Sequence, residues 1–456
     1  MMDELRKYLG DKKILILGFG KEGQSTYSLL RKLFPEKTLC IADRNENLKE
    51  NEIIKADSAR VRLHLGDTYL DNISDYDLII KSPGISLKNF SDCDFSKFTS
   101  HTELFIRLFR KHIIGITGTK GKSTTASLIH HIISAYTKNC VLVGNIGVPP
   151  FDMLDSINRD TIIVYELSSH QLEQVQVSPH ISVLLNLYEE HLDHYQSFEN
   201  YQQAKLKIAL FQDDKDFFIY NGDDSRITKL MKENTLRAKL IKFSLSQRQH
   251  QGCFLKNGKV FYEDSTEIEV LNEIEFKNLI GEHNLQNIMA AVCASIVSGV
   301  PSALMSKAVE SFIPLEHRLE FVGKYNDVLY YNDSISTIPE ATMAAVKSLI
   351  DVDTLILGGF DRGISYERLI DFLNESTIQH LIFIGEAGRR MFTIYQSRDG
   401  EKKDTLVTSD FEQAIAYAKR HTQKNKICLL SPAAASYDMF KDFAERGRKY
   451  IQLLGE

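Results

Sequence analysis

The stretch IIGITGTKGKSTT at 113–125 constrains the fold of this chain more than any other. An apolar run ends at glycines, a lysine and hydroxyls just before a new helical pattern, which predicts a strand, a phosphate-binding loop and a helix. Gly118 and Gly121 allow a tight turn of backbone N–H groups around an anion, while Lys122 supplies charge and Ser123 offers a hydroxyl to magnesium. The spacing fits a short G-x-x-G-K-S loop better than the usual G-x-x-x-x-G-K-S pattern. A nucleoside triphosphate site is therefore predicted.

Composition limits the other possibilities. The 456 residues suffice for about three domains, and the 43% of hydrophobic residues suits ordinary globular cores. The net charge of -6 gives no general attraction to nucleic acid or anionic membranes. The six cysteines form no C-x-x-C pair, which indicates buried reduced thiols. Since no signal-like or long apolar stretch occurs, we expect a soluble, cytoplasmic protein with no membrane span. We also expect a monomer with no nucleic-acid partner.

The first hundred residues carry a second glycine motif. A predicted strand runs directly into G-x-G-x-x-G at 18–23, and the next strand ends at Asp43, about 20 residues further on. This matches the dinucleotide-binding fingerprint, in which glycines admit phosphate and a distant acid holds a sugar or base. A further strand ends in the turn Ser82-Pro83-Gly84, where open α/β sheets bind ligands. The alternative is a nucleotide-like fold kept only for packing.

Polar residues also follow the strands predicted after the phosphate loop. Glu166 ends one strand, where NTP-hydrolysing folds place the acid that holds magnesium, although such an acid is often simply solvated. Asn145 could hydrogen-bond a substrate or only form a turn. His191 and Asp193 could hold a divalent ion. Lys205 lies in a helical stretch, and by default it is an exposed surface lysine.

In this order, these pieces resemble the central-domain motifs of the Mur ligases, the ATP-dependent amide-forming enzymes of peptidoglycan synthesis. The motifs are GTKGKS at 118–123, GNIG at 144–147, ELSSHQLE at 166–173, NLYEEHLD at 186–193 and AK at 204–205. The joint match is highly specific, and the resemblance covers essentially the whole chain.

The resemblance implies roles for the central residues. Ser123 and Glu166 would hold one magnesium ion with the ATP phosphates, and His191 would hold a second. Lys205 would be carbamylated, which turns an ammonium into an oxygen anion able to bridge toward magnesium. The implied catalytic residues are Lys122, Glu166, His191 and Lys205. The implied metal ligands are Ser123, Glu166, His191 and Lys205. The implied ATP contacts are Gly118, Thr119, Lys120, Gly121, Lys122, Ser123, Thr124, Asn284, Asn287, Arg318 and Asp333. Without the resemblance, Asn284 and Asn287 would be helix-capping residues.

Two substrate sites are implied in the same way. The UDP-sugar would contact Lys21, Glu22, Asp43, Arg44, Ser82, Pro83, Gly84, Asn145, Ser168 and Gln171. The incoming amino acid would contact Thr337, Arg362, Ser436 and Phe443.

Beyond residue 314, strands alternate with helices and end in polar turns, which indicates another doubly wound sheet. We therefore expect an α/β protein of three domains. Residues 1–100 would form a UDP-binding Rossmann-like domain, 101–314 a central P-loop ATPase-like domain with a parallel sheet and helices, and 315–456 an amino-acid-binding Rossmann-like domain.

The short single-Rossmann first domain most resembles the branch that adds D-glutamate to UDP-N-acetylmuramoyl-L-alanine. Two positions depart from that branch. Residues 333–338 read DSISTI where the family usually has DSKATN, so Ile335 replaces a lysine, and Arg362 stands where lysine is commoner. Arginine still pairs with a carboxylate through two bonds, but with a different reach. An L-glutamate-adding relative is therefore the near alternative.

The implied reaction runs through an acyl phosphate. The alanyl carboxylate would attack the γ-phosphoryl group of ATP, and the amino group of glutamate would then displace phosphate to form an amide. The domains would close on ATP to exclude water. A catalytically silent UDP-sugar-binding regulator is the second class, but it would have no use for all four catalytic residues. A folate-polyglutamate synthetase is the third, and it leaves the first glycine motif unexplained.

Overall fold

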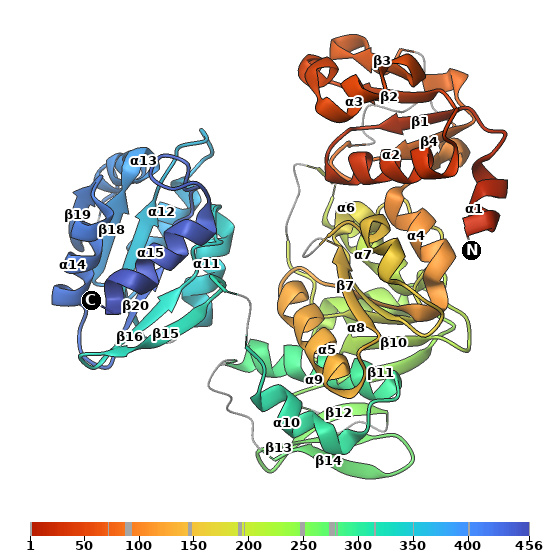
Figure 1. Ribbon diagram of the computed structural model, residues 1–456. Helices are drawn as coiled ribbons and strands as arrows, with labels where there is room; N and C mark the ends of the chain where they lie inside the picture. The colour runs from red at the N-terminus through yellow and green to blue at the C-terminus, as the bar shows by residue number, and fades with distance from the viewer. Residues whose placement is uncertain are drawn as a thin grey trace. The chain divides into compact units, whose positions relative to one another are not determined.

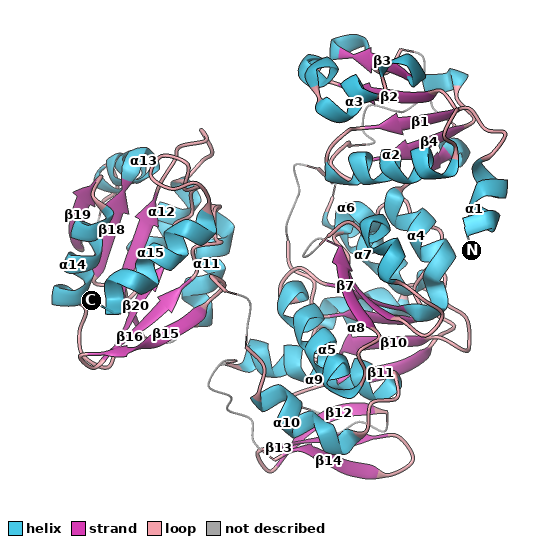
Figure 2. Ribbon diagram, in the orientation of Figure 1, coloured by secondary structure: helices cyan, strands magenta, loops and turns pink. Residues whose placement is uncertain are grey.

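The computed structural model describes residues 2–71, 73–86, 94–144, 148–189, 194–195, 197–246, 251–272, 279, 281–313, 316–349, 351–399 and 402–455. They form two compact units, one of Met1–Phe276 with Asn284–Phe312 and the other of Lys277–His283 with Ile313–Glu456. Figure 1 follows the chain through both, and Figure 2 shows helices packed around each large sheet. The expected boundaries near residues 100 and 314 stay predictions. In the described residues, no helix is long and apolar enough to cross a membrane.

The first sheet has five parallel strands in the order β3-β2-β1-β4-β5. The strands are β1 Ile14–Leu17, β2 Leu39–Asp43, β3 Val61–Leu65, β4 Leu78–Lys81 and β5 Phe98–Thr99, and the helices are α1 Met2–Leu9, α2 Lys21–Leu33 and α3 Glu52–Ala56. Strand β1 is buried along its whole length, as an inner strand of a parallel sheet requires. A Cβ on Gly23 would lie 2.1 Å from the Gly18 carbonyl oxygen, so only glycine lets α2 start so close to β1.

The second sheet has six parallel strands in the order β11-β10-β9-β6-β8-β7. They are β6 Ile113–Thr117, β7 Cys140–Gly144, β8 Ile162–Glu166, β9 Ile181–Leu184, β10 Phe217–Asn221 and β11 Lys239–Phe243. The accompanying helices are α4 His101–Phe109, α5 Lys122–Tyr136, α6 Ser169–Leu172, α7 Phe198–Leu210, α8 Ser225–Lys232, α9 Glu282–Val297 and α10 Met305–Glu310. Because β6 is an inner strand between β8 and β9, the loop after it opens among the carboxyl ends of its neighbours.

A small antiparallel sheet follows the second one along the chain. It consists of β12 Gly252–Lys256, β13 Lys259–Glu263 and β14 Glu267–Leu271. The sequence analysis predicted no structure for this segment.

Helix α4 connects the first two sheets within their unit. Its Phe105 ring packs against two other rings. The distance between ring centres is 5.8 Å to Tyr165 of β8 and 5.4 Å to Phe151. The His101 ring Nδ1 and the Thr26 hydroxyl of α2 share a hydrogen bond of 2.9 Å. One apolar cluster therefore includes residues of both sheets.

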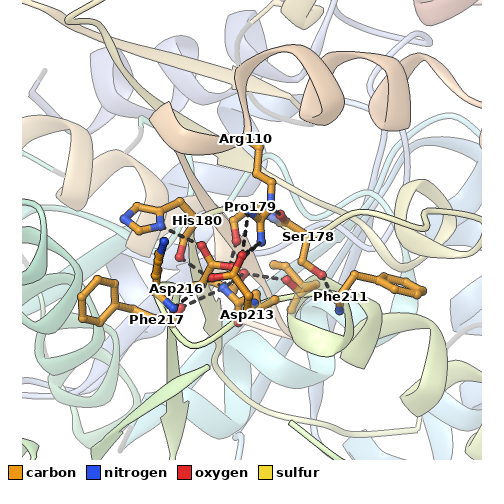
Figure 3. A network of polar contacts seen from close by, with 12 residues as sticks. Arg110, Ser178, Pro179, His180, Phe211, Asp213, Asp216 and Phe217 are labelled. Carbon is orange, nitrogen blue, oxygen red and sulfur yellow. Dashed lines mark hydrogen bonds and ion pairs between the residues drawn. The ribbon is translucent and has the colours of Figure 1, made fainter. Parts of the chain in front are cut away.

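A polar network ties together the amino ends of β6, β9 and β10 (Figure 3). The buried carboxylate of Asp216 receives the Arg110 guanidinium, bonds the His180 ring at 2.8 Å and accepts from the backbone N–H of Asp213 at 2.8 Å. The Arg110 Nε also donates to the Ser178 carbonyl oxygen at 3.0 Å. These bonds hold together the amino ends of the three strands. The phosphate loop lies at the opposite end of the sheet, where β6 ends.

The third sheet has six strands in the order β15-β16-β20-β17-β18-β19, and only β15 runs antiparallel to its neighbour. They are β15 Glu320–Tyr325, β16 Val328–Asn332, β17 Val352–Gly358, β18 His380–Ile384, β19 Asp404–Thr408 and β20 Ile427–Leu430. The helices are α11 Pro339–Ser348, α12 Glu367–Glu375, α13 Gly385–Gln396, α14 Phe411–His421 and α15 Phe443–Gly455. Separate apolar clusters include alternate residues of the inner strands, as helices on both faces of a sheet produce.

Candidate active site

The phosphate loop lies at the carboxyl end of β6 and leads into α5. Gly121 has φ of +82°, and a Cβ there would lie 2.3 Å from the Asn287 Oδ1, so the turn requires glycine. Asn186 holds the loop with two bonds: its Oδ1 accepts from the Lys120 backbone N–H at 2.8 Å, and its Nδ2 donates to the Lys120 carbonyl oxygen at 3.0 Å. The loop is therefore shaped before any ligand arrives.

The lysine of the loop is directed back over it. Lys122 Nζ donates to the carbonyl oxygens of Gly118 at 3.0 Å and Thr119 at 2.9 Å. The Thr119 hydroxyl bonds the Tyr201 hydroxyl at 2.9 Å and accepts from the Tyr188 N–H at 2.9 Å. The structure thus places the whole predicted set Gly118, Thr119, Lys120, Gly121, Lys122, Ser123 and Thr124 in one loop and helix start.

Lys205 is buried against this loop, with 1% of its surface exposed. Its Nζ donates to the Gly118 carbonyl oxygen at 2.9 Å and lies 4.9 Å from the centre of the Tyr201 ring. The default expectation of an exposed lysine is wrong because α7 turns its Tyr201, Ala204, Lys205 and Ile208 side inward.

Glu166 is fully buried at the end of β8, which excludes the interpretation of a merely solvated acid. It pairs with Ile116 of β6, so it ends level with the start of the phosphate loop. Just beyond, Ser168 and Gln171 form a capping box at α6: the Gln171 N–H donates to the Ser168 hydroxyl, and the Ser168 N–H donates to Gln171 Oε1. The predicted residues Asn145 and His191 lie outside the described residues.

Asn287 of α9 reaches the same loop. Asn287 is 5% exposed and touches Gly121, and its Nδ2 donates to Asn284 Oδ1 at 3.2 Å. A residue far along the chain thus contacts the phosphate loop directly, which a plain helix-capping role does not require.

A cavity of about 400 Å³ lies at the carboxyl edge of the first sheet. Among the residues that line it are seven of the predicted UDP-sugar contacts: Lys21, Glu22, Asp43, Arg44, Ser82, Pro83 and Gly84. Tyr69 also lines the cavity and was missed, because it follows β3, a strand that the sequence analysis did not predict. The carboxylate of Asp43 is already used by the fold, because it accepts from the backbone N–H groups of Phe19 and Asn45, each at 2.8 Å.

Contacts from the second sheet reach this cavity. Gln171 Nε2 donates to Glu22 Oε1 at 2.6 Å, and burial raises the pKa of the Glu22 carboxyl. Lys81, which the sequence analysis did not single out, lies 3.9 Å from Glu173 and donates to the Ser82 and Ile85 carbonyl oxygens. Burial lowers the pKa of Lys81 to about 8. The turn at 82–84 is thus held from below by a buried lysine.

In the second unit, Asp333 follows β16 and is 2% exposed. Its carboxylate accepts from the Ser431 hydroxyl at 2.7 Å and from the Leu319 N–H at 3.2 Å. Burial raises the pKa of Asp333 to about 6, and the neighbouring charge of the exposed Arg318 opposes that rise.

The predicted amino-acid contacts lie at this same carboxyl edge. Arg362 Nη2 donates to the Thr337 carbonyl oxygen at 2.5 Å. Ser436 is buried after β20, and the carbonyl oxygen of Phe443 at the start of α15 accepts from the Ser334 hydroxyl at 2.7 Å. The structure also brings in Arg446, a buried arginine to which the sequence analysis gave no role.

Three family models match successive parts of the chain. They are the Mur ligase MurD-like N-terminal domain at residues 12–91, the Mur ligase middle domain at 116–295, and the Mur ligase glutamate ligase domain at 317–434.

Known proteins match over nearly the full length. UDP-N-acetylmuramoylalanine--D-glutamate ligase of Clostridium tetani is 34% identical over 99% of this chain and 98% of its own, and that of Listeria innocua is 33% identical over 98% and 96%. Among solved structures, MurC from Thermotoga maritima covers 97% of this chain and 98% of its own, with a TM-score of 0.54 at 17% identity. MurF from Thermotoga maritima in complex with ADP covers 97% and 93%, with a TM-score of 0.55 at 15% identity. These structures confirm the expected fold class.

Proposed function

The chain belongs to the Mur ligase family, and we propose that it forms an amide bond with ATP, adding D-glutamate to UDP-N-acetylmuramoyl-L-alanine in peptidoglycan precursor synthesis. The observation that carries this proposal is the full-length match to D-glutamate ligases in a chain whose phosphate loop is flanked by a buried glutamate and a buried lysine. We place the reaction in the cytoplasm and expect a monomer.

Nucleotide binding is assigned to the phosphate loop and the elements around it. Lys122 and the N–H groups at the start of α5 would receive the β- and γ-phosphates. Asn284 and Asn287 of α9 would contact the nucleotide beside Gly121, which Asn287 already touches. The resemblance also assigns Arg318 and Asp333 to ATP, and that assignment stays a prediction.

The residues at this edge fit magnesium. The Ser123 hydroxyl and the Glu166 carboxylate follow neighbouring strands and supply the hard oxygen donors that this ion prefers. When bound, magnesium would neutralise charge on the transferring phosphoryl group. We assign a second ion to His191. Carbamylation of Lys205 would convert a buried ammonium beside Gly118 into an oxygen donor.

The acid substrate is assigned to the cavity of the first sheet. Its seven predicted lining residues would hold the uridine diphosphate, and Ser168, Gln171 and Asn145 would direct the sugar end toward ATP. Since Gln171 bonds Glu22, the cavity and the central sheet share one polar contact.

The amino acid is assigned to the carboxyl edge of the third sheet. Arg362 and Ser436 would bind carboxylates there, and Thr337 and Phe443 would complete the site. The pairing of Arg362 with the Thr337 carbonyl oxygen supports one shared site for these residues.

The chemistry then needs no nucleophilic side chain. The alanyl carboxylate attacks the γ-phosphorus, ADP leaves, and an acyl phosphate forms. The glutamate nitrogen attacks the activated carbonyl carbon, the C–O bond to phosphate breaks, and the nitrogen loses its extra proton as the amide forms. The protein orients the three substrates and keeps water from the acyl phosphate.

Trapping the intermediate tests this proposal. With ATP, magnesium and UDP-N-acetylmuramoyl-L-alanine but no amino acid, hydroxylamine should capture the acyl phosphate as a hydroxamate. Lys122→Ala should lower the yield at least about a hundredfold, while Lys111→Ala, an exposed lysine before β6, should leave it unchanged. A silent UDP-sugar-binding regulator would give no hydroxamate with the wild-type chain.

A further inference from the structure

Arg446 of α15 is fully buried, and every N–H of its guanidinium is used. Nε donates to the Ser334 hydroxyl at 3.0 Å, and Nη2 donates to the carbonyl oxygens of Ser334 at 2.9 Å and Ala434 at 3.1 Å. Nη1 donates to the carbonyl oxygens of Gly358 at 3.4 Å and Ala435 at 3.2 Å. With no donor left over, this side chain does not bind a ligand itself.

Its acceptors belong to three adjacent strand ends. Ser334 follows β16, Gly358 ends β17, and Ala434 and Ala435 follow β20. The strands lie in the order β16-β20-β17, so one side chain joins the loops at the middle of the sheet's carboxyl edge.

Each of these loops carries a proposed amino-acid contact. Ser436 comes directly after Ala435, Thr337 lies three residues after Ser334, and Arg362 lies four residues after Gly358. The Ser334 hydroxyl, which accepts from Arg446, donates in turn to the Phe443 carbonyl oxygen at 2.7 Å. Shifting the guanidinium would therefore shift the loops that carry these residues.

The loops approach too closely for ordinary side chains. A Cβ on Gly359, which follows β17, would lie 2.1 Å from the Ala435 carbonyl oxygen and 3.0 Å from Arg446 Nη1. Gly359 has φ of +136°, which also favours glycine. Glycine at position 359 thus lets the loops after β17 and β20 approach each other next to the Arg446 guanidinium.

The charge of Arg446 is not matched by a contacting acid. In the described part of the chain no carboxylate oxygen lies within 4.0 Å of its nitrogens, and Asp438 acts on it only from further away. Burial lowers the pKa of Arg446 to about 10, so the group stays positive at neutral pH. A buried cation without a contacting acid is costly, and here it lies beneath an edge proposed to receive an acidic amino acid.

We propose that Arg446 is a positioning residue for the amino-acid substrate, because it fixes the three loops that carry the contacts and adds positive potential for the substrate carboxylates. This inference rests on the proposed function. Arg446 touches no substrate, so it acts only through the geometry of the loops that it joins and through its charge.

Steady-state kinetics of Arg446→Lys test the inference. Lysine keeps the charge but cannot donate to three loops at once, so the KM for glutamate should rise about tenfold, equivalent to about 1.4 kcal/mol. The KM for the UDP-sugar should stay within about twofold, because its assigned site includes none of these loops. The KM for ATP should rise less than that for glutamate, because the one ATP contact assigned to these loops, Asp333, is held by the Ser431 hydroxyl and not by Arg446. Arg448→Lys, on the exposed side of the same helix, is the matched control and should leave all three constants unchanged.

Ser334→Ala provides a second route if Arg446→Lys fails to fold. It removes one acceptor of the guanidinium and the bond to Phe443, so the KM for glutamate should again rise selectively. Suppose that the wild-type chain does ligate glutamate. Equal rises in all three KM values, or no change of the KM for glutamate in either variant, would then overturn the inference and leave the proposed function standing. If the wild-type chain ligates no glutamate, the proposed function fails and the inference fails with it.

Discussion

Ionisable side chains buried at the carboxyl ends of strands are the most informative residues of this chain. Lys205 contacts the phosphate loop, Lys81 lies under the turn at 82–84, and Asp333 follows β16. Since burial disfavours the charged form, such groups persist mainly where function or a specific partner requires them. At the residue scale, these positions therefore support ligand sites at the edges of the sheets.

Asp333 should make stability depend on pH. Its pKa is raised from 3.8 to about 6 in the folded state, so between these values the folded chain holds a proton that the unfolded chain has lost. The free energy of unfolding should therefore fall as pH rises through this window, by up to about 1.4 kcal/mol per pH unit. Asp333→Asn lacks this titration, so its melting temperature should gain on that of the wild-type chain between pH 5 and pH 7. Calorimetry showing a constant difference would contradict this.

Gly121 should not tolerate a methyl group. In Gly121→Ala the new Cβ would combine a positive φ with a clash against Asn287 Oδ1, so the loop must move. We expect the KM for ATP to rise at least about tenfold, or about 1.4 kcal/mol. Gly258→Ala is the control, because Gly258 has φ of +73° but open space around it. Equal effects of the two substitutions on ATP would show that the contact with Asn287 is unimportant.

The sequence predicted which residues form the phosphate loop better than it predicted which charged side chains are buried. The motif at 118–123 predicted the phosphate loop because its glycines, lysine and hydroxyls have a direct chemical use. Lys205 was expected at the surface because the helix YQQAKLK is locally polar, and only the packing of α7 buries it. Arg446 carried no local signal either, since its acceptors lie on loops far apart in the sequence.

At the scale of elements, the two ends of the strands have different roles. The carboxyl ends carry the candidate site residues, whereas the network around Asp216 holds together the amino ends of strands in the second sheet (Figure 3). Apolar runs predicted one strand just before the phosphate loop and another that ends at Glu166, and β6 and β8 lie there. The antiparallel strands at 252–271 gave no such signal, because they are only partly buried and contain charged residues.

Asp216 should be a determinant of stability. Asp216→Ala leaves Arg110 without its closest acid and the His180 ring without its carboxylate, so unfolding should become easier by about 2–4 kcal/mol. Asp214→Ala, an exposed neighbour, should be neutral. Thermal melting measures both, and ligase activity per folded molecule should stay unchanged because the network lies at the edge opposite the phosphate loop. A melting temperature equal to that of wild type would contradict the role of the network.

At the scale of the whole molecule, three open sheets supply three groups of candidate ligand residues. The fold class and the family were predictable because each sheet begins with a recognisable strand and glycine-rich or polar turn, and the comparisons confirm both. The choice of amino acid was harder to predict. Ile335 and Arg362 replace residues that are usually lysine, and a carboxylate can pair with either kind of cation.

The most direct measurement combines the purified chain with ATP, magnesium and UDP-N-acetylmuramoyl-L-alanine and offers D- or L-glutamate separately. The account predicts one phosphate released for each amide formed, with D-glutamate and not with L-glutamate, and a product heavier by one glutamate residue in the mass spectrum. Ligation of L-glutamate alone would contradict the assigned substrate. Phosphate release that is independent of both the sugar acid and the amino acid, with no amide product, would contradict the ligase itself.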